Sequence, residues 1–218
     1  MPASSHHTLE LDTPHGIARV HLHPVDRSVA ALVLGHGAGG GVTAADLLAA
    51  TGAASALSVT VALVEQPYRV AGRRSPAPAR QLDAAWSAVL AQLRVGTLNG
   101  LAVLAGGRSS GARVACRTAA EVGAAGVVCL AFPLHPPGRG DDPAKSRLGE
   151  LDAVAVPTLV VQGERDPFGM PPDGPGRTVI RVPGDHALRS TAAVAAAASE
   201  WLAGFLDAPG RSRSGGAR

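Results

Sequence analysis

The sequence predicts an α/β fold in which a mostly parallel, eight-stranded sheet is covered by helices on both faces. Short apolar runs alternate with Ala-rich windows of helical length along most of the 218 residues. Most of these runs are apolar at every position, which is typical of parallel strands buried on both faces. The length fits one large domain. Because 46% of residues are hydrophobic and only 3% aromatic, we expect a core of Ala, Val and Leu.

Sequence period and turn residues predict each element in turn. Residues 8–12 and 17–22 form a hairpin that turns at residues 14–16. The other predicted strands are 30–34, 59–64, 101–104, 126–131, 157–161 and 178–182, and the predicted helices are 44–57, 79–94, 111–122 and 190–206. We expect a single domain over residues 1–206 and a disordered tail over residues 207–218.

Three long connections, 65–78, 132–150 and 163–177, are rich in Pro, Gly and Arg. Ligands of open parallel sheets bind beyond the carboxyl ends of the strands, so chemistry is expected in such connections. None of them is long enough for a separate cap domain. We therefore expect a shallow, open site.

Charge and hydropathy exclude several classes of protein. The net charge is +3 and the isoelectric point about 9.5, but the tail from residue 207 contributes a net +2, so nucleic-acid binding is not implied. No apolar run reaches the roughly 18 residues of a membrane span, and no membrane association is expected. The N-terminus does not resemble a secretory signal, so a cytoplasmic location is expected.

The two cysteines, Cys116 and Cys129, lie within predicted regular elements and lack the spacing of metal ligands. We expect both to be buried free thiols, with neither a disulfide framework nor a zinc site. No metal or other cofactor is expected.

A candidate nucleophile follows the predicted strand 101–104. Gly107, Ser109 and Gly111 form G-x-S-x-G between this strand and a helix. In that context the serine occupies a sharp, strained turn that exposes its hydroxyl, and a Cβ at either glycine would collide with a neighbouring element. The pattern alone is weak, because a Gly-Ser loop would also match it.

A serine nucleophile needs a base and the base needs an orienting acid, each expected after a later strand. Asp166 follows the predicted strand 157–161, and His186 follows the predicted strand 178–182. Asp166 would orient the imidazole and His186 would accept the Ser109 proton. Glu164 is an alternative acid, whereas Asp185 would point away from the ring that it should orient.

An acyl-transfer site also needs donors for the developing oxyanion. The Ser110 amide, directly after the nucleophile, supplies one donor. Gly37 or Ala38, in the glycine-rich loop after the strand 30–34, supplies the other, and His36 would brace this loop.

The same loop also supports a rival reading. Gly35, Gly37 and Gly40 form G-x-G-x-x-G between a strand and a helix, and Glu65 ends the next strand, where an acid could bind a ribose. This dinucleotide-binding alternative leaves the Ser109 motif, Asp166 and His186 unexplained.

Together these residues resemble the α/β-hydrolase superfamily over about residues 30–206. Within it the chain is similar to small lidless hydrolases related to dienelactone hydrolase, a group that includes testis-expressed protein thirty and the hydrolase-like domain of a non-specific-lethal complex subunit. The matching segments are 34–39, 66–68, 72–74, 107–111, 132–138, 162–169 and 184–186. The resemblance implies the fold and a triad of Ser109, Asp166 and His186. One departure is Glu65-Gln66, which stands where an aromatic residue is expected before Pro67.

The expected function is hydrolysis of an ester, thioester or related acyl bond in a small-molecule substrate, through an acyl-enzyme on Ser109. The candidate substrate-binding residues are Arg108, Tyr68, Arg73, Arg74 and His135. The arginines could instead order the Pro-rich loops. A hydrolase-like scaffold that binds proteins without turnover is the alternative function. The sequence does not indicate an oligomeric state.

Overall fold

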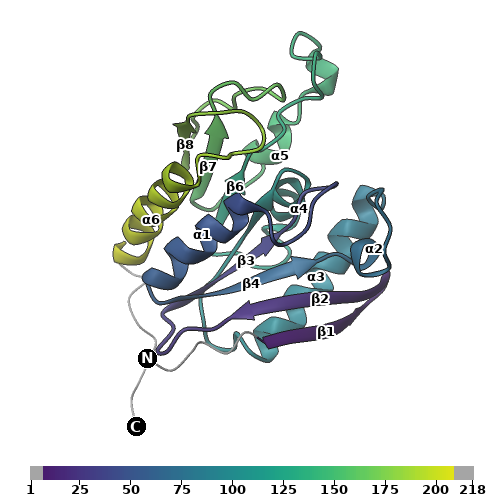
Figure 1. Ribbon diagram of the computed structural model, residues 1–218, viewed down its shortest axis with the longest axis vertical. Coiled ribbons are helices and arrows are strands. Elements are labelled where there is room, and N and C mark those ends of the chain that lie inside the picture. The colour runs from purple at the N-terminus through teal and green to yellow at the C-terminus, as the bar shows by residue number, and fades with distance from the viewer. Residues whose placement is uncertain (1–6, 209–218) are drawn as a thin grey trace.

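The computed structural model describes residues 7–208, and its eight strands form one sheet in the order β1-β2-β4-β3-β5-β6-β7-β8 (Figure 1). The strands are β1 His7–Thr13, β2 Gly16–His23, β3 Ala30–Gly35, β4 Val59–Glu65, β5 Val103–Arg108, β6 Gly126–Leu130, β7 Thr158–Gly163 and β8 Arg177–Val182. Strand β2 pairs antiparallel with β1 and β4, and all other neighbouring strands pair parallel. The predicted eight-stranded, mostly parallel sheet is confirmed.

Helices cover both faces of the sheet. Helices α1 (Ala45–Ala56) and α6 (Thr191–Asp207) contact each other on one face, in front of the sheet in Figure 1, and α3 (Ala79–Val95) and α4 (Ser110–Thr118) pack on the other. Each face buries its own apolar cluster, built largely from Ala, Val and Leu. The large aromatic side chain of Trp86 is buried in the cluster under α3 and α4.

Some element boundaries differ from the sequence prediction. Strand β5 begins at Val103 and runs to Arg108, because Gly106 and Gly107 still pair with Leu34 and Gly35 on β3. Helix α4 ends at Thr118 rather than at 122, and a turn with Gly123 at φ +60° follows it.

The long connections contain short helices that the sequence did not predict. These are α2 (Pro67–Val70), α5 (Leu148–Asp152) and a 3₁₀ turn (Pro143–Lys145). Helix α6 ends at Asp207, one residue beyond the predicted helix end, so this residue of the predicted tail is helical. Residues 209–218 of the predicted tail lie outside the described part of the chain, and its disorder stays a prediction.

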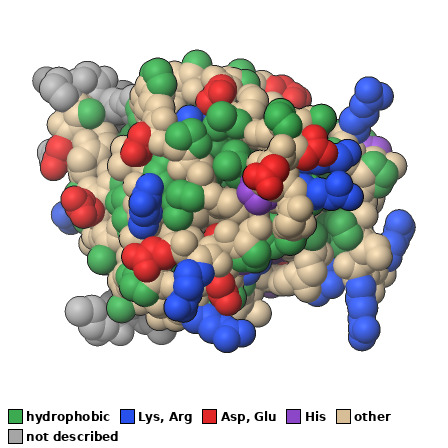
Figure 2. Space-filling model, turned by 90° about the horizontal axis from the view of Figure 1, so that it is seen from above, with side chains coloured by type: hydrophobic (Ala, Val, Ile, Leu, Met, Phe, Trp, Pro, Cys, Tyr) green, Lys and Arg blue, Asp and Glu red, His purple; other side chains and the backbone are tan. Residues whose placement is uncertain are grey.

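Surface charge is mixed on the face seen in Figure 2, where acidic, basic and apolar side chains are interspersed over most of the area. Basic side chains protrude at its right-hand edge, the side on which α2 lies in Figure 1. In the described residues 7–208, no helix is both long and apolar enough to cross a bilayer. The cytoplasmic location stays a prediction.

The two cysteines are free and buried, as predicted. Cys116 on α4 and Cys129 on β6 lie with their Sγ atoms 3.5 Å apart, a proximity that the sequence did not reveal. The hydrogen bond between the thiols, followed by burial, raises the pKa of Cys129 well above its ordinary value. Both effects keep the thiol protonated, and therefore weakly nucleophilic.

We therefore expect the folded protein to react slowly with a thiol reagent such as dithionitrobenzoate at pH 8. In the protein unfolded in guanidinium, both cysteines should react at once, as measured by the absorbance of the released thionitrobenzoate. Rapid reaction of the folded protein would contradict the burial and the raised pKa.

Candidate active site

Ser109 lies in a strained turn between β5 and α4, with φ +51° and ψ −107°. Non-glycine residues rarely adopt this region, and such strain persists only when the surrounding structure enforces it. Here the enforcing contact is between glycines. A Cβ on Gly107 would lie 2.5 Å from the Gly35 carbonyl oxygen, and a Cβ on Gly111 would lie 2.6 Å from the Gly35 carbonyl carbon. Strand β3 can approach the turn only because these side chains are missing.

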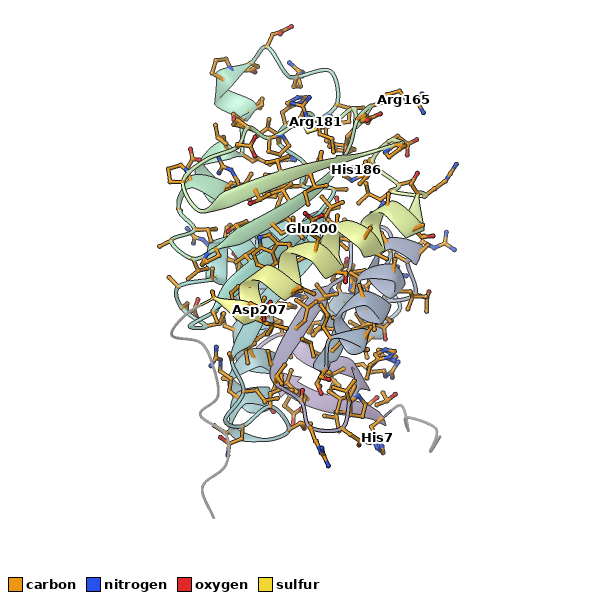
Figure 3. The ribbon with its side chains drawn as sticks, turned by 90° about the vertical axis from the view of Figure 1, so that its left-hand side faces the viewer. His7, Arg165, Arg181, His186, Glu200 and Asp207 are labelled. Carbon is orange, nitrogen blue, oxygen red and sulfur yellow. The ribbon has the colours of Figure 1, made fainter. Side chains whose placement is uncertain are left out.

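The His186 ring lies between Ser109 and Asp166. Its Nε2 atom is 3.0 Å from Ser109 Oγ, and its Nδ1 atom is 2.8 Å from Asp166 Oδ2. The three residues follow β5, β7 and β8, so the parallel strands bring their carboxyl ends to one edge of the sheet. In Figure 3, His186 lies toward the end of the molecule where α6 begins, and Asp207 lies at the opposite end of this helix.

The Asp166 carboxylate is fully buried and saturated with donors. Besides His186, it accepts hydrogen bonds from the Phe168 amide at 2.8 Å and from Gln162 Nε2 at 2.9 Å. Gln162 is itself fully buried on β7, and its Nε2 atom also lies 3.0 Å from the Phe132 carbonyl oxygen and 2.8 Å from that of Gly169, so its two N–H groups are shared among three acceptors. The sequence did not predict this role of Gln162, although a glutamine directly after the apolar run 157–161 was a usable signal.

Other candidate residues lie elsewhere. Glu164 is exposed, and the carboxylate that contacts His186 is that of Asp166. Asp185 accepts the Ala187 amide, and this hydrogen bond is the main cause that lowers the pKa of its carboxyl. The Phe168 ring packs against the His186 ring with centroids 4.2 Å apart, which restricts the imidazole further.

Three backbone amides are available beside the serine. Within residues 7–208, the amides of Gly37, Ala38 and Ser110 donate no backbone hydrogen bond. Ser110 is the first residue of α4, where the free amides and the helix dipole favour negative charge. Gly37 lies close to the turn, since a Cβ on it would be 3.6 Å from Ser109 Cβ.

His36 and Tyr68, whose rings pack edge to face, each contact a carbonyl of the glycine-rich loop. The Gln66 amide donates to His36 Nε2, so the neutral ring carries its proton on Nδ1 and donates to the Gly37 carbonyl at 2.8 Å. Burial is the main cause that lowers the pKa of His36. The Tyr68 hydroxyl donates to the Ala38 carbonyl at 2.9 Å, and burial raises the pKa of this phenol.

Glu65, the candidate ribose ligand, is engaged with strand β2. Its carboxylate lies 3.2 Å from His21 Nε2 and 3.7 Å from an Arg19 nitrogen. The glycine-rich loop meanwhile packs against the Ser109 turn. Glu65 and the glycine-rich loop therefore have separate structural roles. Dinucleotide binding would require neither role.

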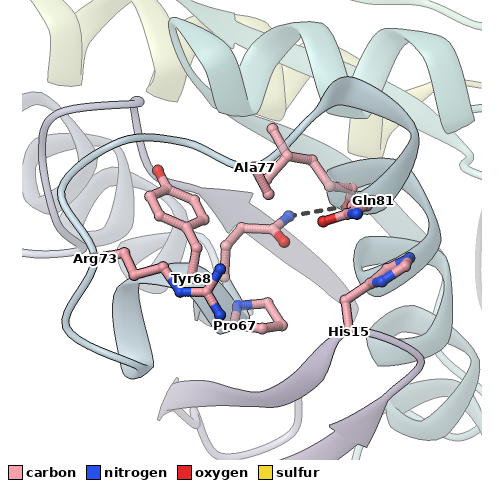
Figure 4. A pocket seen from close by; sticks show the side chains of 8 residues that line it. His15, Pro67, Tyr68, Arg73, Ala77 and Gln81 are labelled. Atoms are coloured by element: carbon pink, nitrogen blue, oxygen red, sulfur yellow. Dashed lines mark hydrogen bonds between the residues drawn. The ribbon is translucent and has the colours of Figure 1, made fainter.

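The candidate substrate-binding residues Tyr68, Arg73 and Arg74 lie on the connection after β4, and His135 lies on the connection after β6. Arg73 lines a pocket with Gln66 and Tyr68, seen from close by in Figure 4, and Arg74 is exposed on the same loop. His135 packs against Gly169, and its Nδ1 atom lies 2.8 Å from the Pro136 carbonyl oxygen.

Arg108 differs from these residues because its guanidinium contacts two other segments of the chain. It forms an ion pair with Asp46 and donates a hydrogen bond to the His186 carbonyl. Within the described residues, no cluster of three His, Cys, Asp or Glu side chains could hold a metal ion.

A family model described as alpha/beta hydrolase domain matches residues 28–174 of the chain. The protein belongs to this α/β hydrolase family. The match spans the glycine-rich loop, the Ser109 turn and Asp166. No curated protein matches the sequence.

Several solved structures share the fold at low identity. A lidless serine hydrolase from Xanthomonas campestris is 21% identical, with a TM-score of 0.73 over 95% of this chain and 98% of that one. Est1E from Butyrivibrio proteoclasticus is 13% identical, with a TM-score of 0.74 over 93% and 99%. Dienelactone hydrolase from Anabaena variabilis is 15% identical, with a TM-score of 0.70 over 93% and 96%.

The close contact of the Ser109 turn with β3 in this α/β hydrolase can be tested by substitution. Gly111→Ala places a methyl group against the Gly35 backbone, so we expect a loss of about 1–3 kcal/mol in the free energy of unfolding, measured by urea denaturation. Gly52→Ala is the matched control, because it lies in α1 with no atom within 4 Å of the new Cβ. That variant should gain about 0.5–1 kcal/mol. Equal effects of the two substitutions would contradict the close approach.

We expect His36 to make the free energy of unfolding depend on pH. Because its pKa in the folded protein is lowered, its contribution is present above the unfolded pKa of about 6.5 and is lost as pH falls through the folded value. His36→Gln should therefore flatten the loss of stability between pH 7 and 5, measured by urea denaturation at each pH. His15→Gln, at an exposed histidine, is the control for the loss of an imidazole. A His36→Gln slope equal to that of the wild type would contradict this account.

Proposed function

We propose that this α/β hydrolase is a serine hydrolase that cleaves an ester, thioester or related acyl bond through an acyl-enzyme on Ser109. The observation that supports this proposal most strongly is the chain of contacts from Asp166 through His186 to Ser109, at 2.8 Å and 3.0 Å. A serine hydroxyl is a weak nucleophile until an adjacent base accepts its proton, and this arrangement supplies both the base and its orienting acid.

In the acylation step, Ser109 Oγ attacks the acyl carbonyl carbon while its proton passes to His186 Nε2. The carbonyl oxygen becomes an oxyanion, for which the amides of Ser110 and of Gly37 or Ala38 are the donors. His186 then returns the proton to the leaving alcohol or thiol as the bond to the acyl carbon breaks. Asp166, which contacts Nδ1, stabilises the imidazolium without taking its proton.

In the deacylation step, His186 removes a proton from water, and the resulting nucleophile attacks the acyl-enzyme. The second oxyanion collapses, the carboxylic acid leaves, and the proton returns to Ser109. One water is consumed for each acyl bond cleaved. The same donors and the same base serve both steps.

Small or end-presented acyl groups fit this site best. The connections around the site carry only the short helices α2 and α5 and a 3₁₀ turn, and none of them covers Ser109 as a cap domain would. We propose Tyr68, Arg73, Arg74 and His135 as residues that contact the substrate beyond the acyl carbon, with the arginines suited to an anionic group.

A fluorophosphonate probe tests the nucleophile. We expect stoichiometric labelling of wild type at the Ser109 peptide, read by mass spectrometry, and none in Ser109→Ala. Ser110→Ala is the matched control, because its proposed role uses the backbone amide, and it should still take the label. A short p-nitrophenyl ester should be hydrolysed by wild type and lose at least about 10³-fold in kcat/KM in Ser109→Ala. Absence of labelling in wild type would remove the proposal and favour a binding scaffold.

A further inference from the structure

Resting on the function proposed above, we infer that Arg108 and Asp46 are positioning residues that hold the base and the oxyanion donors in register with Ser109. Arg108 is the last residue of β5 and directly precedes the serine. Its Nε atom lies 2.9 Å from Asp46 Oδ2, and its Nη2 atom donates to the His186 carbonyl at 3.0 Å. The guanidinium thus joins the start of α1 to the segment that carries the base.

Asp46 supplies a buried negative charge next to this arginine. The side chain is 1% exposed in the first turn of α1, and its Oδ1 atom accepts the Leu47 amide. Within residues 7–208, Arg108 is the only cation in salt-bridge range of this carboxylate. Burial raises the pKa of Asp46, and Arg108 opposes that shift. A buried charge of this kind is tolerated only when it is paired.

Arg108 also contacts the glycine-rich loop. A Cβ on Gly37 would lie 2.9 Å from Arg108 Nη1, so the loop backbone runs directly against the guanidinium. Three segments therefore contact one side chain: the loop of the proposed oxyanion donors, the start of α1 nine residues later, and the distant segment of His186. The planar fork of arginine can serve all three at once, whereas the single ammonium of lysine cannot.

This arrangement predicts an effect on the transition state rather than on substrate binding. Moving His186 or Gly37 by even a fraction of an ångström weakens proton transfer and oxyanion stabilisation, which matter only during reaction. A loss of that kind lowers kcat and leaves KM nearly constant. Arg108 acting as a substrate ligand would do the opposite, raising KM for anionic substrates while kcat is retained.

The test measures kcat and KM for a neutral and an anionic short-chain ester, together with the rate of Ser109 phosphonylation. Arg108→Met should lower kcat and the phosphonylation rate about 10- to 100-fold for both esters, with KM within about threefold of wild type. Arg108→Lys, which keeps the ion pair but cannot reach both partners, should be intermediate. In Arg108→Ala, added methylguanidinium should restore part of kcat, because the side chain is 19% exposed and its site is open to solvent.

Arg113→Met is the matched control. Arg113 is on α4 and pairs through Nε with Glu150 at 2.8 Å, so its loss removes a comparable ion pair outside the proposed machinery. It should lower the melting temperature and leave kcat within twofold of wild type. Should Arg108→Met not fold, the near-isosteric Asp46→Asn carries the test and should lower kcat about 3- to 30-fold.

The outcomes separate the two proposals. A wild-type protein that takes no fluorophosphonate label overturns the proposed function and this inference together. A labelled wild type with kcat unchanged in Arg108→Met, or in Asp46→Asn if the former is unfolded, overturns the positioning role alone. A raised KM limited to the anionic ester, with kcat retained, also overturns it and assigns Arg108 to substrate binding.

Discussion

The close approach of β3 to the turn after β5 is the constraint on which the site depends. Gly35, Gly107 and Gly111 meet with too little space for a Cβ at Gly107 or Gly111. The chain can therefore reverse from strand to helix within one residue, and Ser109 takes up the strain at φ +51°. The same approach brings the glycine-rich loop after β3 alongside Ser109, so one backbone contact presents both the hydroxyl and the candidate oxyanion donors.

The other half of the site is held by buried polar contacts rather than by backbone packing. Gln162 and the Phe168 amide fix the Asp166 carboxylate, which faces His186. Arg108 donates a hydrogen bond to the His186 carbonyl. Burying a polar group without a partner is costly, so these hydrogen bonds favour one arrangement of the side chains. Buried hydrogen bonds thus hold the part of the site in which the reacting groups have to be placed to within a fraction of an ångström.

Much of this architecture could be predicted from the sequence because it is encoded locally. Apolar runs give the strands, and the G-x-S-x-G pattern gives the Ser109 turn. Partners distant in sequence could not be predicted in the same way: nothing in the sequence pairs Asp46 with Arg108, or Cys116 with Cys129, until the sheet is assembled. Strand β5 extends past its apolar run because Gly106 and Gly107 pair with β3. That pairing is a tertiary effect which local propensity does not register.

The central claim is that Ser109, His186 and Asp166 act as one unit, and non-additivity tests it most directly. The measurement is the rate of Ser109 phosphonylation in His186→Gln, in Asp166→Asn and in the double variant. If Asp166 acts only through the imidazole, the double variant reacts no more slowly than His186→Gln alone. Losses that multiply, with the double variant slower by the product of the two single effects, would show that Asp166 acts independently of His186 and would contradict the account.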